Sequence, residues 1–213
     1  MISDSGKPVS TVIALVMAAG FSRRFGQQDK RTALLPSGQP LLGQLLTGLQ
    51  GRFKHLAVVI RPEDDPAVLA IPDGVHILRA ANAAEGLGAS IADGVDQLLA
   101  IDLPGIESLA LMLGDMPVPA TSTLALLLEN QAAARIVRPI YQPDAISADQ
   151  KQPGHPVLFG REFWLQLTRL SGEDGAKAVI RNNRDCLTLI TVNDVRVLQD
   201  VDQPDALLRY PAS

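Results

Sequence analysis

A loop near the amino terminus combines small residues with cations, the residue types that bind phosphate groups. After the uncharged run Val12–Met17 come three small residues and then four cations: Ala18, Ala19 and Gly20, followed by Arg23, Arg24, Lys30 and Arg31. Glycines such as Gly20 and Gly26 let backbone N–H groups approach a ligand closely, and cations neutralise a bound polyanion. We therefore predict a phosphate site at the end of a buried strand. The alternative is a solvated basic turn.

Aspartates at two other places have the chemistry of metal ligands. Asp115 comes just after the apolar run Ser108–Leu113, and Asp200 and Asp202 lie late in the chain, before a proline. Mg²⁺ prefers one or two carboxylates together with phosphate oxygens and water. We predict a Mg²⁺ site formed by Asp115 with one of the late aspartates. Two structural alternatives stay open, with Asp115 as a helix-entry residue and Asp202 as the N-cap of the last helix.

The elements that must position these residues alternate between strands and helices in the first part of the chain. Apolar runs predict strands at Val12–Met17, His55–Ile60, Val75–Leu78 and Ser108–Leu113. Helical spacing predicts helices over Leu41–Leu49, from Glu63 to about Ala70, through Ile91–Leu99 and around Leu124–Leu128. This alternation is typical of a parallel α/β sheet, whose right-handed crossovers bring the strand ends to one edge.

The second half of the chain has a less regular pattern. Strands are predicted at Arg135–Ile140, Gly154–Phe159, Leu187–Val192 and Val195–Leu198, with a surface loop at Tyr141–Pro153. Helices are predicted from Arg161 to about Leu170, over Asp174–Arg181 and over Asp202–Tyr210. Neither a repeat nor a linker is evident, so we expect a single domain over residues 1–213, with residues 1–10 as a flexible amino terminus.

Composition excludes several classes of function. The chain has 213 residues, 46% of them hydrophobic, and a net charge of −4, which argues against a nucleic-acid binder. The cations near Arg24 therefore indicate a focused anion site. One cysteine, Cys186, allows no internal disulfide, and no apolar run reaches membrane-spanning length. We expect a cytoplasmic protein that does not interact with membranes.

Common nucleotide-binding motifs are missing, and histidines are few. The chain contains no GxxxxGK[ST] sequence, and no GxGxxG follows the first strand. Of three histidines, His55 and His76 lie in or beside apolar runs and are interpreted as packing or surface residues. His155 precedes Pro156, and two readings stay open for it: contact with an acceptor, or a structural hydrogen bond.

Six blocks of sequence together resemble a known family. VMAAGFSRRFGQQDK, at residues 16–30, is similar to the signature of the MobA-like nucleotidyltransferases. NAAEGLGAS, LGDMP, GHPVLF, LSGEDGAKAVI and LQDVDQPDAL resemble later blocks of that family, in the same order and over nearly the whole chain. Because the first turn reads AAG rather than AGG, and GDMP and GHP follow, the resemblance is greatest to the molybdenum-cofactor cytidylyltransferase branch.

This resemblance implies a fold and a reaction. The fold would be a three-layer α/β/α, Rossmann-like nucleotidyltransferase fold of GT-A type with a mostly parallel sheet. The reaction would transfer CMP from CTP to the terminal phosphate of a molybdopterin-type cofactor and release pyrophosphate, with Mg²⁺ as cofactor. The attacking phosphate is largely ionised near neutral pH, so positioning and electrostatic stabilisation suffice without a strong general base.

The resemblance also implies roles for individual residues. Nucleotide binding would involve Ala18, Ala19, Gly20, Ser22, Asn82, Gly86 and Ser90. Arg24 and Lys30 would bind the triphosphate and act in catalysis together with Asp115, the metal ligand. Asp200 or Asp202 would complete the metal shell, and His155 would lie near the acceptor.

Departures from the family pattern leave alternatives open. Gln28 and Asp29 lengthen the spacing before Lys30, and Val201 and Gln203 replace the usual residues of the last block. Another phosphorylated acceptor, or GTP in place of CTP, is one alternative. A nicotinamide-dependent oxidoreductase on the same fold and a non-catalytic nucleotide-binding regulator are others. A cytidylyltransferase of this branch would also contact a cofactor-accepting enzyme transiently.

Overall fold

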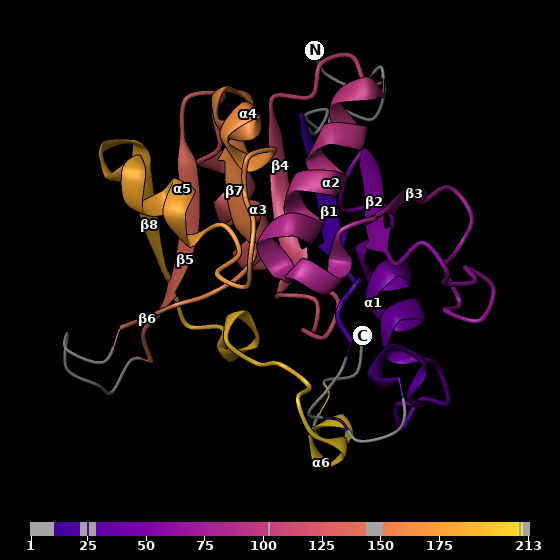
Figure 1. Ribbon diagram of the computed structural model, residues 1–213. Coiled ribbons are helices and arrows are strands. Elements are labelled where there is room, and N and C mark those ends of the chain that lie inside the picture. Colours follow the sequence, from indigo (N-terminus) through magenta and orange to yellow (C-terminus); the bar gives the residue numbers. More distant parts are fainter. Residues whose placement is uncertain are drawn as a thin grey trace.

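Parallel strands at the centre of a sheet organise the computed structural model (Figure 1), which describes residues 11–21, 25, 29–101, 103–143, 151–208 and 210. β1 (Val12–Met17) pairs in parallel with β2 (His55–Ile60) on one side and β4 (Ser108–Leu113) on the other. β3 (His76–Arg79) lies outside β2 and is parallel to it. Every residue of β1 is buried, as its uninterrupted apolar sequence predicts for a strand covered on both faces.

The other half of the sheet is mixed. The strand order is β3-β2-β1-β4-β7-β5-β6, and β8 (Leu187–Val192) pairs in parallel with β5 (Ile136–Tyr141). β7 (Val157–Gly160) is antiparallel to both of its neighbours, β4 and β5, and β6 (Gln152–Pro153) is antiparallel to β5. The predicted mostly parallel α/β fold is confirmed. Because β7 runs backwards, the residues that precede it lie at the carboxyl edge of β4.

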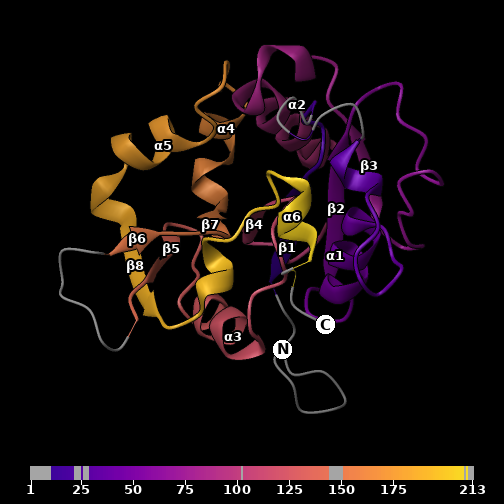
Figure 2. The same cartoon turned by 90° about the horizontal axis from the view of Figure 1, so that it is seen from below.

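Helices cover both faces of the sheet. α1 (Leu41–Leu49) and α3 (Thr121–Glu129) pack on one face. α2 (Leu87–Ala100), α4 (Trp164–Leu167) and α5 (Lys177–Asn182) pack on the other. Seen along the sheet, α4 and α2 lie opposite α3 (Figure 2). Short 3-10 helices occur at Lys30–Thr32, Ala83–Glu85, Arg161–Phe163 and Arg184–Cys186.

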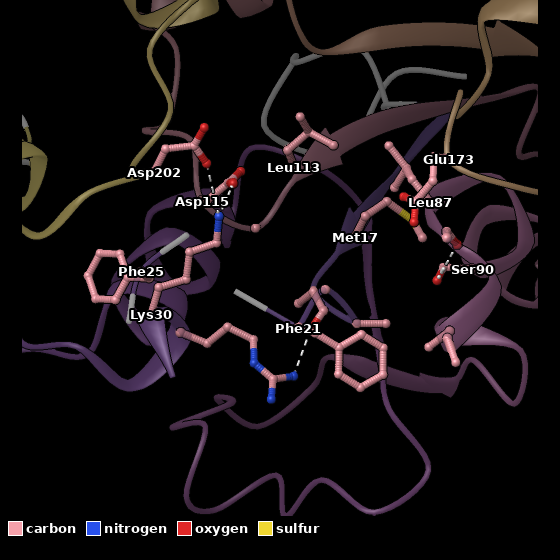
Figure 3. Close-up of a pocket in the computed structure, with 18 residues that line it drawn as sticks. Met17, Phe21, Phe25, Lys30, Leu87, Ser90, Leu113, Asp115, Glu173 and Asp202 are labelled. Atoms are coloured by element: carbon pink, nitrogen blue, oxygen red, sulfur yellow. Dashed lines mark hydrogen bonds and ion pairs between the residues drawn. The ribbon is translucent and has the colours of Figure 1, made fainter. Parts of the chain in front are cut away.

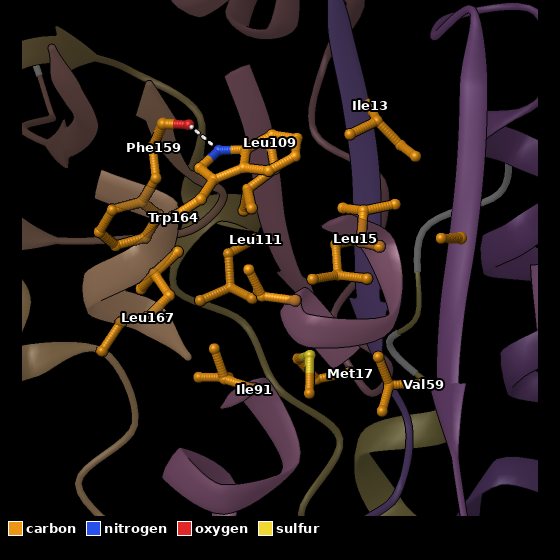
Figure 4. Close-up of a cluster of buried hydrophobic side chains, with 14 of the residues drawn as sticks. Ile13, Leu15, Met17, Val59, Ile91, Leu109, Leu111, Phe159, Trp164 and Leu167 are labelled. Atoms are coloured by element: carbon orange, nitrogen blue, oxygen red, sulfur yellow. Dashed lines mark hydrogen bonds between the residues drawn. The ribbon is translucent and has the colours of Figure 1, made fainter. Parts of the chain in front are cut away.

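Two apolar clusters hold these layers together. On the α2 face, Ile13, Leu15 and Met17 of β1 belong to one cluster with Ile91 of α2 (Figure 4). Trp164 is fully buried in this cluster, and its indole N–H donates to the carbonyl of Phe159 at 3.0 Å. The remaining β1 residues pack beneath the leucines of α1 and α3. Alternate residues of one strand therefore supply both cores.

One predicted strand is wrong. Val195–Leu198 was expected to be extended, but Val195–Val197 forms a 3-10 turn. Asp194 begins this turn, because its side chain accepts a hydrogen bond from the backbone N–H of Arg196. The local cap therefore outweighs the β-propensity of the valines.

The helix predicted from Glu63 to Ala70 is also wrong. The segment forms turns, and Ala70 has a φ of 52°. Pro66 interrupts it, and the Asp65 side chain accepts from the backbone N–H of Ala67. The Asp64 carboxylate accepts hydrogen bonds from Arg31, which is distant in sequence, and from Arg61, directly after β2, so tertiary contacts and local caps decide this conformation.

Other predicted elements are present with shorter bounds. The last helix, α6, spans Pro204–Leu207 with Gln203 as its N-cap, so the structural alternative in which Asp202 caps it does not hold. α5 begins at Lys177 rather than at Asp174. The predicted loop Tyr141–Pro153 contains the short strand β6, and its residues 144–150 lie outside the described part of the chain. Within the described segments, no helix is long and apolar enough to cross a membrane.

Candidate functional site

A cleft of about 580 Å³ opens where β1 and β4 end. The chain passes from β1 outward to β2 and β3 and then returns to β4 on the other side of β1. Such a reversal of strand order leaves a crevice at the carboxyl ends of the strands, where open α/β sheets bind ligands. Figure 3 shows the residues that line this cleft: Met17, Ala18, Ala19, Gly20, Phe21, Phe25, Lys30, Arg31, Ala83, Ala84, Gly86, Leu87, Ser90, Leu113, Gly114, Asp115, Glu173 and Asp202.

Charged residues from three distant segments meet at one end of the cleft. The Lys30 ammonium lies 2.5 Å from a carboxylate oxygen of Asp115 and 3.6 Å from one of Asp202 (Figure 3). The Lys30 and Asp115 side chains are only 16% and 19% exposed, respectively. The structure thus brings together three of the residues that the sequence singled out, and Asp115 lies in a turn, well before α3 begins at Thr121.

Val201 anchors the late aspartates beside Asp115. Its backbone N–H donates to the Asp115 carbonyl at 2.9 Å, and its buried side chain packs with Phe25 and Leu41. Asp202 lines the cleft, whereas Asp200 lines a neighbouring cleft. Burial, followed by the negative charges of Asp202 and Asp115, raises the pKa of Asp200. The loop therefore concentrates negative charge at this edge of the sheet.

The donor set at this end fits a divalent cation that arrives with a phosphorylated ligand. Asp115 and Asp202 converge on a single cationic atom, the Lys30 nitrogen, as ligands converge on a metal ion. Within the described part of the chain, no group of three or more His, Cys, Asp or Glu side chains could hold a metal by itself. Mg²⁺ normally takes one or two protein carboxylates and completes its octahedron with phosphate oxygens and waters.

A buried cluster of charges supports the loop that carries Lys30. Arg31 is 3% exposed, and its guanidinium donates to both carboxylates of Asp29 and Asp64. It also donates to the carbonyl of Ala18, the residue that follows β1 and lines the cleft, at 2.7 Å. Arg61 donates to the same two carboxylates. These contacts join the loops after β1 and β2 into one unit.

Of two glycines next to the charged end, Gly114 is required by close packing and Gly20 is not. A Cβ atom at Gly114 would lie 2.9 Å from the Met17 carbonyl, so close packing of the β1 and β4 ends demands a glycine there. A Cβ at Gly20 would meet no described atom within 4 Å. Packing therefore does not explain Gly20, which lies exposed on the cleft and leaves space for a ligand backbone contact.

The other end of the cleft is built from two glycine-containing turns. Gly86 has a φ of 118°, and a Cβ there would lie 2.6 Å from the Gly172 carbonyl. The backbone N–H of Gly88 donates to that same carbonyl at 2.7 Å. Ser90 is buried, and its hydroxyl donates to the Gly86 carbonyl. The close packing of its turn against Gly172 therefore requires a glycine at position 86. The Ser90 hydroxyl oxygen can still accept a hydrogen bond from a ligand in the cleft.

Asn82 lies outside the cleft lining. Its side-chain amide donates to Asp93 at 2.9 Å, and its backbone N–H donates to the same carboxylate at 2.7 Å. The structure thus uses Asn82 to fasten the turn onto α2. Ser22 and Arg24, which the sequence placed with the nucleotide and the triphosphate, lie outside the described residues.

His155 lies one strand away from the charged end. It precedes Pro156 in a cis peptide bond, and its backbone N–H donates to the Val197 carbonyl at 2.8 Å. Its Nδ1 atom is buried without a hydrogen-bond partner in the described structure. Burial, and next the positive charge of Arg138, lower the pKa of His155 to about 4. The imidazole is therefore neutral at neutral pH.

Some cleft residues, Phe21 and Glu173 among them, received no role from the sequence, and Arg31 was expected as a phosphate-binding cation rather than as a buried support. Phe21 is 44% exposed, and its ring packs 5.2 Å from the Arg61 guanidinium carbon. Glu173 lines the cleft opposite Lys30, and Arg31 supports the first turn from below. An exposed phenylalanine between a glycine and a serine was a usable signal for Phe21. The burial of Arg31 depends on Asp64, thirty-three positions away, and had no local signal.

Comparisons with known proteins agree with this architecture. A family profile described as MobA-like NTP transferase domain matches residues 14–187. No curated protein matches the chain. A homologue of Mycobacterium tuberculosis Rv0371c from Mycobacterium sp. strain JC1 has a similar structure, with a TM-score of 0.73 and 30% identity. That similarity covers 93% of this chain and 94% of the homologue.

Two more distant structures share the fold. Rv0371c of M. tuberculosis H37Rv in complex with manganese has a TM-score of 0.65 and 22% identity, covering 87% of this chain and 89% of its own. A nucleotidyl transferase from Methanothermobacter thermautotroptrophicus has a TM-score of 0.71 and 16% identity, covering 93% and 94%.

Proposed function

The chain belongs to the MobA-like NTP transferase domain family, and from this premise we propose that it transfers CMP from CTP to the terminal phosphate of a molybdopterin-type cofactor. The observation that supports a nucleotidyl transfer most directly is the convergence of Lys30, Asp115 and Asp202 in the cleft between β1 and β4. The choice of CTP and of this acceptor extends the sequence resemblance.

The charged end of the cleft would receive the triphosphate. Lys30, and with it Arg24, would bind phosphate oxygens and neutralise the charge that develops as pyrophosphate leaves. Asp115 and Asp202 would hold a divalent cation, with Asp202 preferred to Asp200 because it lines the same cleft as Lys30. When bound, that cation would neutralise phosphate charge and orient the triphosphate.

The nucleoside would lie along the first turn. Ala18 and Ala19 are buried and line the cleft, so their backbones rather than their side chains would meet the base and ribose. Gly20 leaves open space at the next position. Ser22, Gly86 and Ser90 would complete the nucleoside site. Asn82 would act through the turn that it fastens to α2, since its amide is engaged by Asp93.

The chemistry needs orientation more than a base. An oxygen of the acceptor phosphate attacks the α-phosphorus, the bond from that phosphorus to the bridging oxygen breaks, and pyrophosphate leaves with the electron pair. The acceptor phosphate is already largely ionised at neutral pH. His155, whose pKa is lowered to about 4, is neutral there and would position the acceptor rather than take up a proton.

We propose Mg²⁺ as the divalent cation. The carboxylate pair supports a hard cation with oxygen ligands. The manganese complex of Rv0371c supports a divalent metal in a related fold, since Mn²⁺ favours the same oxygen ligands.

Pyrophosphate release tests this function. The purified protein with Mg²⁺ and molybdopterin is assayed with CTP, GTP, ATP and UTP, and the nucleotidylated product is identified by mass spectrometry. We expect turnover with CTP. Turnover with GTP alone would overturn the cytidylyl assignment, and transfer only to other phosphorylated acceptors would overturn the acceptor. NAD(P)H oxidation without pyrophosphate release would instead indicate an oxidoreductase.

A further inference from the structure

The face of the sheet that forms the cleft continues beyond it toward β5. Met17 of β1 is in register with Leu113 of β4, and both line the cleft. Leu111 is in register with Val157 of β7, which places His155 beside Leu113 when the antiparallel pairing is continued. Since side chains alternate along strands, these positions share one face.

Arg138 is the next polar residue along this face. Ile136, two positions earlier on β5, packs in the same apolar cluster as Met17 and Val157, so Arg138 projects from the cleft side of the sheet. It is half-buried near the carboxyl end of β5. A cation therefore lies on the face that carries the cleft, on the far side of His155 from Lys30.

Within the described segments, Arg138 has no negatively charged partner of the kind that a half-buried cation normally has. Its Nε atom donates to the Gly154 carbonyl at 3.1 Å and its Nη2 atom to the Pro153 carbonyl at 3.4 Å. Among the described residues, no carboxylate forms an ion pair with it. Burial without a counter-ion lowers the pKa of Arg138 and favours any anion that can reach the guanidinium.

His155 links Arg138 to the charged end of the cleft. Its ring experiences the positive charge of Arg138 and the negative charge of Asp115, so it lies within electrostatic range of both. The Nδ1 atom of its ring is buried and has no hydrogen-bond partner in the described structure. A neutral ring with a spare nitrogen is suited to a hydroxyl or N–H donor on a bound molecule.

We propose that Arg138 binds the anionic group of the acceptor and that His155 orients the acceptor beside it. This assignment rests on the proposed transferase function and deepens it, because it locates the second substrate. Lys30 and Arg138 would then bind different anions. Such a separation counters the repulsion between a triphosphate and an acceptor phosphate that must react with each other.

Kinetics of matched variants test the assignment. Arg138→Gln should raise the KM for molybdopterin about ten- to a hundred-fold, the loss expected for a charge-assisted hydrogen bond, and leave the Kd of CTP unchanged. Arg138→Lys keeps the positive charge, so its KM for molybdopterin should rise less than that of Arg138→Gln. The control is Arg135→Gln, which removes the same charge from an exposed position at the amino end of β5. An unchanged acceptor KM in Arg138→Gln would overturn the proposal.

A titration of the wild-type protein provides a readout that does not depend on turnover. The Nε–Hε signal of Arg138 in a ¹⁵N–¹H spectrum is identified from its loss in Arg138→Lys, and inorganic phosphate is added without nucleotide. We expect this signal to shift while that of Arg135 does not. A shift without any CMP transfer would refute the proposed function and keep the anion site. Transfer without a shift would refute the anion site alone.

Discussion

Arg31, in the 3-10 helix that follows β1, and Arg138, in β5, have charges that are compensated in opposite ways. Arg31 is buried in the amino-terminal half and bound by the carboxylates of Asp29 and Asp64. Arg138 is half-buried in the carboxyl-terminal half, and its described hydrogen bonds go to the carbonyls of Gly154 and Pro153. One guanidinium is surrounded by negative charge within the described structure, and the other is not.

We interpret Arg31 as a cation that holds the fold together and Arg138 as the cation proposed to bind an anionic ligand. A buried charge with complete carboxylate partners fixes the segments that contribute them, here the loops after β1 and β2. A half-buried charge that keeps only neutral partners retains its electrostatic attraction for a ligand. The two guanidinium groups therefore differ in the charge of the groups that surround them.

The largest expected effect follows from removing Arg31. Arg31→Met removes the most deeply buried cation of the cluster and leaves Asp29 and Asp64 with Arg61 as their described partner, which should cost about 3 kcal/mol of the free energy of unfolding. Urea denaturation followed by circular dichroism measures it. The double variant with Asp64→Asn should lose less than the sum of the two single losses, because the groups interact directly. A loss below about 1 kcal/mol would contradict a structural role for the cluster.

Removing Lys30 should affect turnover more than stability. Lys30→Met should lower kcat about 10²- to 10³-fold, as expected when one preorganised electrostatic contact to the reacting phosphates is lost. The control is Lys54→Met, which removes an exposed lysine just before β2 begins. Steady-state pyrophosphate release compares the two variants. Equal activities would show that the contact of Lys30 with Asp115 is merely structural.

Asp194 makes the stability of the carboxyl-terminal half depend on pH. Burial alone would raise its pKa, but hydrogen bonds from Arg196, the Ala120 backbone and Thr123 hold the pKa below 3.8, the usual value for Asp. A lowered folded pKa stabilises the protein fully above that usual value, and the contribution disappears as the pH falls through the folded value.

Asp194→Asn should therefore destabilise the protein by about 1–3 kcal/mol at neutral pH and weaken the loss of stability toward acid. Melting temperatures measured from pH 7 to pH 3 provide the check. Parallel curves for the variant and the wild type would refute this assignment.

The smallest expected effect is on stability at Arg138. Replacing Arg138 with Met loses hydrogen bonds to two carbonyls but also removes a charge that burial penalises, so the free energy of unfolding should change by less than about 1 kcal/mol. Urea denaturation beside Arg31→Met measures the contrast. A loss as large as that of Arg31→Met would erase the distinction between the two arginines.

Much of the fold followed from local patterns. The continuous apolar run of β1 predicted a strand buried on both faces, and the leucine spacing of α1 predicted its helix. Errors arose where polar caps or distant partners prevailed, as at Asp194 and at Asp64. Periodicity reports the burial of apolar faces and contains no information on such polar contacts.

Part of the site was also readable. Lys30, Asp115 and Asp202 were singled out as a cation beside glycines and as aspartates near strand ends, and the structure brings all three together. Asp200 and Asp202 were equivalent in sequence, and only the anchoring of Val201 on Asp115 separates them. Arg138 and Glu173 had no distinguishing pattern.

The buried strand β1, the alternation of strands and helices and the position of Asp115 after β4 were determined by the sequence alone, because each depends on neighbours a few residues apart. The antiparallel direction of β7, the burial of Arg31 and the position of Arg138 on the cleft face were decided by tertiary structure. They depend on which distant segments meet across the sheet. The sequence gives the charge of each residue, but the groups that compensate this charge depend on the fold.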